Sequence, residues 1–121
     1  MKVAICVTEN KGLDSLVDSR FGRTSGFVLC DTETEECEYL SNEQNLNALQ
    51  GAGVQAAQNV VNAGAQAVAT GFCGPKAFQV LSAARVHIFQ DCKGSVRDVL
   101  QSIREGNFSS SNMPNKTQGH W

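Results

Sequence analysis

The segment 70–77 combines a thiol, a lysine and two glycines at a predicted strand–turn–helix junction. Gly71 and Gly74 allow a tight turn, and the proline that follows suits the first position of a helix. Free backbone N–H groups and the positive end of the helix dipole attract anions at such a junction. With Cys73 and Lys76 beside them, these groups predict a site for a small anion or a thiophilic metal species.

Two further loops carry residues of the same chemistry. Arg20 and Arg23 lie in a long polar loop, where they can bind an anionic ligand or pair with the nearby Asp14 and Asp18. Cys92 follows another predicted strand and is a second candidate metal ligand, although the neighbouring aspartate disfavours its thiolate. The cation of Lys76 opposes the dipole of its helix, which favours a position facing a ligand over simple exposure to solvent.

Gly51 and Gly53 open another predicted helix, whose N-terminus is a third candidate for anion binding. Their spacing to Ala56 matches a Gly-x-Gly-x-x-Ala dinucleotide fingerprint. The residues 42–50 before it are polar and do not predict the strand that this fingerprint requires, so NAD binding is not expected.

The apolar pattern predicts an α/β fold in which three helices alternate with the later strands. Strands joined through helices should be parallel, with right-handed crossovers, and an initial hairpin should add an antiparallel edge. We expect strands at 3–7, 27–30, 36–40, 67–70 and 86–89, and helices that begin near Val54, Pro75 and Val96 and end by Gly64, Ala84 and Gly106.

Ligands of open α/β sheets bind beyond the carboxyl ends of the strands. Loops 8–23, 71–76 and 90–94 should meet at that edge. The sequence therefore predicts that Cys73 and Cys92 emerge close together there, beside the two arginines of the first loop.

The chain has 121 residues, of which 1–106 are expected to form one domain and 107–121 a flexible polar tail. A net charge of −2 favours neither nucleic acid nor an anionic membrane as a partner, and no apolar run is long enough to span a bilayer. A cytoplasmic protein, monomeric or weakly dimeric, is expected.

The remaining cysteines and a histidine are expected to have structural roles. Five cysteines without Cys-x-x-Cys spacing predict neither a disulfide scaffold nor a zinc ribbon. Cys6 and Cys30 should be buried in strands, Cys37 should be half-buried on an edge strand, and His87 should be packed within the last strand.

Three segments occur in an order that resembles the dinitrogenase iron–molybdenum cofactor biosynthesis family, which includes NifX, NafY and NifB C-terminal domains. They are 19–23 (SRFGR), 51–53 (GAG) and 70–78 (TGFCGPKAF). The resemblance covers about residues 1–106 and is strongest to small single-domain members. It implies a ribonuclease H-like fold with five strands in the order 3-2-1-4-5, strand 2 antiparallel, and three helices.

The resemblance also implies non-catalytic binding, carriage or assembly of an anionic metal–sulfur cluster. Such a cluster would be an iron–sulfur, iron–molybdenum cofactor precursor or molybdenum–copper sulfide species, exchanged with donor and recipient proteins. On this hypothesis Cys73 and Cys92 are soft ligands. The remaining contacts would come from cationic side chains and glycine-rich turns at Arg20, Arg23, Gly51, Gly53, Gly71, Gly74 and Lys76.

The alternative is a regulatory or protein-interaction module without bound metal, docking through the edge of the hairpin. Catalysis is not expected. Two-metal nuclease chemistry needs clustered carboxylates on the strands, whereas the first strand has none and Asp31 stands alone at a strand end.

Overall fold

The computed structural model describes residues 1–43 and 51–107. The described part contains the predicted strands and helices in the predicted order, with a short 3-10 helix, η1 (Gly12–Asp14), after the first strand. The strands are β1 (Lys2–Val7), β2 (Gly26–Asp31), β3 (Cys37–Ser41), β4 (Ala67–Ala69) and β5 (His87–Phe89), and the helices are α1 (Ala52–Asn62), α2 (Pro75–Ala83) and α3 (Val96–Arg104).

The five strands form one sheet in the order β3-β2-β1-β4-β5. The central strand β1 is antiparallel to β2 and parallel to β4, and β5 continues the parallel half. This is the ribonuclease H-like arrangement implied by the family resemblance, so that prediction is confirmed. The carboxyl ends of β1, β4 and β5 consequently lie at one edge of the sheet.

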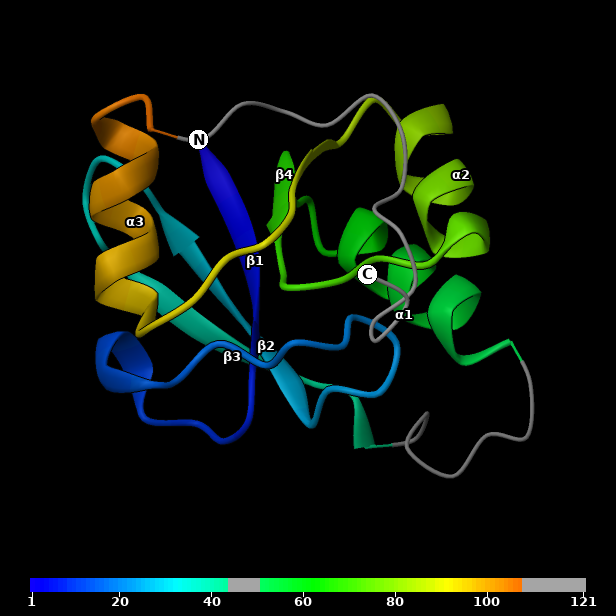
Figure 1. The fold of residues 1–121 in the computed structure, drawn as a ribbon, viewed down its shortest axis with the longest axis horizontal. Coiled ribbons are helices and arrows are strands. Elements are labelled where there is room, and N and C mark those ends of the chain that lie inside the picture. Colours follow the sequence, from blue (N-terminus) through cyan, green and yellow to red (C-terminus); the bar gives the residue numbers. More distant parts are fainter. Residues whose placement is uncertain (44–50, 108–121) are drawn as a thin grey trace.

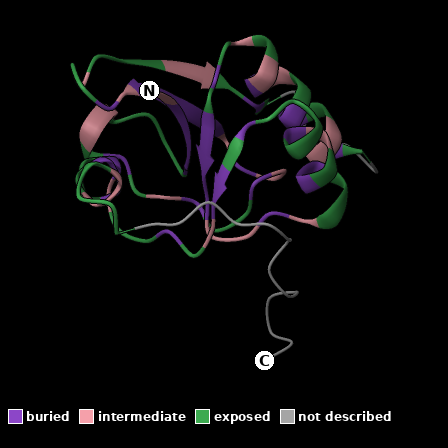
Figure 2. Ribbon diagram, turned by 90° about the horizontal axis from the view of Figure 1, so that it is seen from above, coloured by how far each residue is buried: buried purple, intermediate pink, exposed green. Residues whose placement is uncertain are grey.

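Helices cover both faces of the sheet: α1 and α2 lie on one side and α3 on the other (Figure 1). Side chains of β1 alternate between the two cores. Ala4 and Cys6 pack beneath α1 and α2, whereas Val3, Ile5 and Val7 pack on the face covered by α3. Because both faces are covered, β1 is apolar almost throughout, and its burial is visible in Figure 2.

Local sequence explains where the helices begin. Gly51 has a φ of 79°, a left-handed conformation that glycine adopts without strain, and α1 starts directly after it, two residues earlier than predicted. Pro75 is the first residue of α2, as predicted. Ser95 and Asp98 form a capping box at the start of α3, in which each side chain accepts a hydrogen bond from the other residue's backbone N–H.

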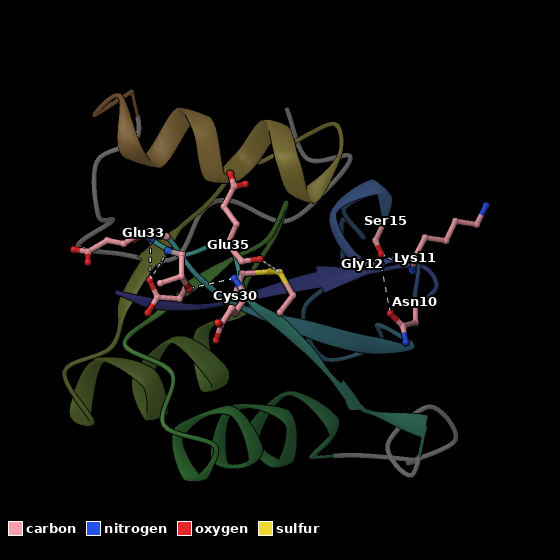
Figure 3. The surroundings of a disulfide bond; sticks show 12 residues. Asn10, Lys11, Gly12, Ser15, Cys30, Glu33 and Glu35 are labelled. Atoms are coloured by element: carbon pink, nitrogen blue, oxygen red, sulfur yellow. Dashed lines mark hydrogen bonds between the residues drawn. A yellow bond between two sulfur atoms is a disulfide. The ribbon is translucent and has the colours of Figure 1, made fainter.

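The hairpin between β2 and β3 contains a disulfide bond, which corrects the expectation of free thiols at Cys30 and Cys37. These residues are direct partners in the antiparallel register and are joined through their sulfur atoms (Figure 3). Cys30 is fully buried, but Cys37 is exposed and not half-buried. Their separation of seven residues does not by itself predict a disulfide. The bond becomes possible because the strand register places the two residues opposite each other.

Hydrogen bonds to a single carboxylate order the turn of this hairpin. Asp31 accepts hydrogen bonds from the backbone N–H groups of Glu33 at 2.8 Å and Thr34 at 3.3 Å. These bonds lower the pKa of Asp31 because they stabilise the ionised carboxylate. Arg104 of α3 then binds the turn from outside, with an ion pair to Glu35 at 2.7 Å.

Burial was predicted for Cys6 and for His87, and the structure confirms it only for Cys6. Cys6 is fully buried, as predicted, and burial raises the pKa of its thiol well above the ordinary value. His87 is exposed, so the prediction of a packed histidine is wrong. It begins β5 at the edge of the sheet, where the next two residues are buried but the first is not. The predicted tail lies outside the described residues, except for Asn107.

Candidate functional site

A pocket of about 690 Å³ lies where the first loop meets the N-terminal turns of two helices. One wall is the segment 20–23, which follows β1 along the chain. The other walls are 51–54 at the start of α1 and 74–77 at the start of α2, and Phe72 also lines the pocket. We call this the cationic pocket; its lining residues are Arg20, Phe21, Gly22, Arg23, Gly51, Ala52, Gly53, Val54, Phe72, Gly74, Pro75, Lys76 and Ala77.

The first loop reaches this position through backbone contacts with the turn after β4. Phe21 N–H donates to the Phe72 carbonyl at 3.1 Å, and Arg20 pairs with Phe72 in a short parallel bridge. The Phe21 ring is buried and packs at 5.5 Å from the ring of Phe27 in β2. Thr24 fixes the end of the loop, since its hydroxyl donates to the Val7 carbonyl at 2.7 Å.

Two glycines make this packing possible because backbone segments touch at their positions. A Cβ atom at Gly22 would lie 2.9 Å from the backbone N and Cα of Gly53 in α1. A Cβ atom at Gly71 would lie 2.8 Å from the Cα of Ser19. A side chain at either position would force backbone segments apart, so the two glycines set how closely the walls of the pocket approach.

Positive charge dominates the described lining. Arg20, Arg23 and Lys76 contribute cationic side chains, and no aspartate or glutamate is among the lining residues that the structure describes. The starts of α1 and α2 add the positive ends of two helix dipoles, and among the described residues no side chain caps the first N–H groups of either helix. The charge of the described lining therefore favours binding of an anion.

Arg20 has a nearby carboxylate behind the pocket. Its Nε atom lies 3.8 Å from Oδ1 of Asp18, and the same oxygen accepts the Arg20 backbone N–H at 3.0 Å. Asp18 is buried, whereas 60% of the Arg20 side chain is exposed. Arg20 therefore pairs with Asp18, one of the two partners considered from the sequence, and its side chain also lines the pocket.

The predicted thiols lie elsewhere. Cys73 is fully buried in the core beneath α1 and α2, and Cys92 is buried in the core on the α3 face of the sheet. Neither residue lines the cationic pocket. Within residues 1–43 and 51–107, no three His, Cys, Asp or Glu side chains are grouped to hold a metal ion. The structure therefore brings the predicted cations and helix N-termini together without the two thiols.

Burial also makes these thiols poor nucleophiles and poor ligands in this conformation. Desolvation raises the pKa of Cys73 to about 12, and it likewise raises that of Cys92 to about 12. The Cys92 thiol instead donates to the Phe89 carbonyl at 3.4 Å. The thiolate, which is the reactive and metal-binding form, is therefore strongly disfavoured at both positions.

We expect iodoacetamide at pH 8 to leave Cys73 and Cys92 unmodified in the folded protein and to alkylate both rapidly in urea. The thiolate is the reacting species, so its low population and its burial both slow the reaction. Mass spectrometry of tryptic peptides measures the modification. Rapid alkylation of Cys73 in the native protein would show that the turn at 71–74 opens and exposes the thiol.

The apolar part of the pocket was not predicted from the sequence. Phe72, Val54 and Pro75 line it together with small alanines, and Phe21 contributes from the loop. One feature of the sequence could have indicated it. Phe21 and Phe72 each adjoin a glycine, and each lies in a segment that was already predicted to contribute to the site. Asp18 was expected only as a possible partner of the loop arginines, and its burial was not predicted.

The fold and this pocket define a class: small ribonuclease H-like α/β proteins with a cationic pocket at the carboxyl edge of the sheet. The chain belongs to the dinitrogenase iron–molybdenum cofactor family, whose model matches residues 1–106. No curated protein gave a significant match. Within the described residues, no helix is both long enough and apolar enough to cross a bilayer.

Solved structures support this assignment. The apo form of the orange protein from Desulfovibrio gigas is 40% identical, with 95% of this chain and 96% of that chain covered and a TM-score of 0.91. A Thermotoga protein assigned to NifB and to the DUF35 family is 27% identical, with 98% of both chains covered and a TM-score of 0.80. A dinitrogenase-type protein from Methanocaldococcus jannaschii, 15% identical, covers 94% of this chain and 97% of its own with a TM-score of 0.66, and shares the fold.

Proposed function

We propose that this protein binds and carries an anionic metal–sulfur cluster in the cationic pocket, without catalysing a reaction on it. The observation that carries the proposal is the convergence of Arg20, Arg23, Lys76 and two helix N-termini on one pocket whose described lining holds no carboxylate. Membership of the iron–molybdenum cofactor family supports a metal–sulfur cargo.

The mixed lining fits a bulky sulfide-rich anion. A volume of about 690 Å³ is large for a single oxyanion, and Phe21, Phe72, Val54 and Pro75 present apolar surface. An oxyanion would lose hydration against such surface without recovering hydrogen bonds at each oxygen. Sulfide is a weaker hydrogen-bond acceptor and is more polarizable, so apolar contact costs it less. The cations then neutralise the overall charge.

The lining residues also support binding without catalysis. The described lining contains no histidine, serine, threonine, cysteine or carboxylate, and therefore no nucleophile paired with a general base. Its cations can bind and orient a charged cargo. We propose that donor and recipient proteins load and remove the cluster, and that the protein works in the cytoplasm as a monomer or weak homodimer.

Cys73 and Cys92 remain second candidates as ligands. Cys73 directly precedes Gly74 of the pocket, so opening of this turn would bring its sulfur toward a bound cluster. In the conformation described here the cluster would retain its own sulfide ligands, and the protein would supply charge, N–H donors and apolar contact.

Anaerobic titration of the metal-free protein with tetrathiomolybdate tests the proposal. We expect stoichiometric binding that shifts the absorption bands of the anion and weakens as salt is raised, since the attraction is electrostatic. Molybdate, the oxygen analogue of the same charge, is the control and should bind more weakly. If the protein bound none of these three ligands (tetrathiomolybdate, molybdate and a molybdenum–copper sulfide), the proposed cargo binding would be contradicted. The interaction module without bound metal would then be favoured.

A further inference from the structure

We propose that Asp18 is an internal counter-ion that competes with the bound anion for Arg20 and so limits the affinity of the cationic pocket. This inference rests on the proposed function and concerns the regulation of the same site. A carrier has to release its cargo, and a competing carboxylate beneath one of its binding cations would aid release.

The backbone fixes Asp18 beside the strand that precedes the pocket. Its N–H donates to the Cys6 carbonyl at 2.8 Å, at the carboxyl end of β1. The side chain is only 10% exposed. Its Oδ1 atom accepts the Arg20 backbone N–H at 3.0 Å, which orients the carboxylate toward the Arg20 side chain.

Among the described residues, Arg20 is the one cationic side chain that lies within ion-pair distance of the Asp18 carboxylate. The Nε–Oδ1 distance of 3.8 Å is long, so the guanidinium is attracted but not locked. A guanidinium has five N–H donors, which leaves several available to a ligand in the pocket. An anion that draws Arg20 forward would leave Asp18 with less compensation, and burial makes that loss costly.

A second arginine pair provides a contrast within the same chain. Arg97 lies 3.0 Å from Asp14, but the Asp14 side chain is 77% exposed, so water compensates it whenever the pair breaks. The Arg97 side chain is 53% exposed, close to the value for Arg20, and it extends from α3 on the opposite face of the sheet. The two pairs therefore differ in the burial of the carboxylate, in the distance between the charged groups and in proximity to the pocket.

The test compares Asp18→Asn with the matched variant Asp14→Asn. Asparagine at position 18 keeps an oxygen that can accept the Arg20 N–H but removes the charge. We expect Asp18→Asn to bind tetrathiomolybdate about three- to tenfold more tightly and to release it more slowly by a similar factor. Asp14→Asn, with the same change in net charge, should stay within about twofold of the wild type.

A double-mutant cycle assigns the effect to Arg20. The increase in tetrathiomolybdate affinity caused by Asp18→Asn should largely disappear in the Arg20→Ala background. Unchanged or weaker binding by folded Asp18→Asn, or the same gain in the Arg20→Ala background, would overturn the counter-ion role. Failure of the wild type to bind any probe anion would instead contradict the proposed function.

Nuclear magnetic resonance on the wild type keeps the inference testable if Asp18→Asn does not fold. On titration with tetrathiomolybdate, the Nε–H resonance of Arg20 and the carboxyl carbon resonance of Asp18 should shift together with the same apparent affinity. A shift at Arg20 with none at Asp18 would show that the ion pair does not respond to the ligand.

Discussion

Replacing Arg20 and Lys76 together by alanine is expected to lower the affinity for tetrathiomolybdate by about 100-fold. Both residues line the cationic pocket, from the first loop and from the first turn of α2. A charge-assisted contact to a partly desolvated anion contributes about 1.5 kcal/mol, which corresponds to about tenfold in affinity for each cation. Equilibrium dialysis under anaerobic conditions measures the change.

The matched control is the pair Arg97→Ala and Lys11→Ala. It removes the same two kinds of cation, and both residues lie outside the pocket in exposed ion pairs, with Asp14 and with Glu9. We expect this control to alter affinity by less than about threefold at physiological salt, because exposed charges beyond a Debye length are screened. Equal losses in the two double variants would show that binding depends on net charge and not on this pocket.

The second large effect is expected from Gly22→Ala. The new Cβ would lie 2.9 Å from backbone atoms of Gly53, and a backbone contact cannot be relieved by a change of rotamer. The first loop and α1 would have to separate. We expect a loss of about 2–3 kcal/mol in the free energy of unfolding and a loss of affinity of about tenfold or more, since Arg20 and Arg23 flank this glycine.

Gly74→Ala is the matched control for this substitution. It makes the same chemical change in the same pocket, but Gly74 has a φ of −68° and, among the described residues, the new Cβ would meet only the Phe72 ring, at 3.9 Å. Urea unfolding should show a change below about 1 kcal/mol for this variant. If Gly22→Ala proved as stable as Gly74→Ala and bound anions normally, the proposed close approach of the loop and α1 would be wrong.

Short-range patterns in the chain were sufficient for the elements and for most of the topology. The apolar run at 3–7 predicted the strand β1, and Pro75 predicted the first residue of α2. Because parallel strands joined by helices share one carboxyl edge, the sequence also predicted that the loop with Arg20 and the turn with Lys76 lie near each other. The pocket contains both.

The burial of the thiols was less predictable from the sequence, because it depends on how the helices pack on each face of the sheet. Cys73 and Cys92 follow neighbouring strands at the same edge, as expected, yet their side chains enter cores on opposite faces of the sheet. Placement along a loop does not determine the direction of a side chain. The disulfide between Cys30 and Cys37 likewise required the hairpin register, which the spacing of the cysteines does not reveal.

The sequence by itself determined which segments carry positive charge, which turn at glycine, and on which edge of the sheet they gather. Only the tertiary structure decided that the cations and two helix N-termini enclose one pocket, that the thiols are buried away from it, and that Asp18 lies buried behind Arg20. The physical reason is that helix, strand and turn propensities act over a few residues, and the rule for parallel crossovers places whole loops at one edge of the sheet. The direction and burial of a side chain are set by contacts between segments far apart in the chain.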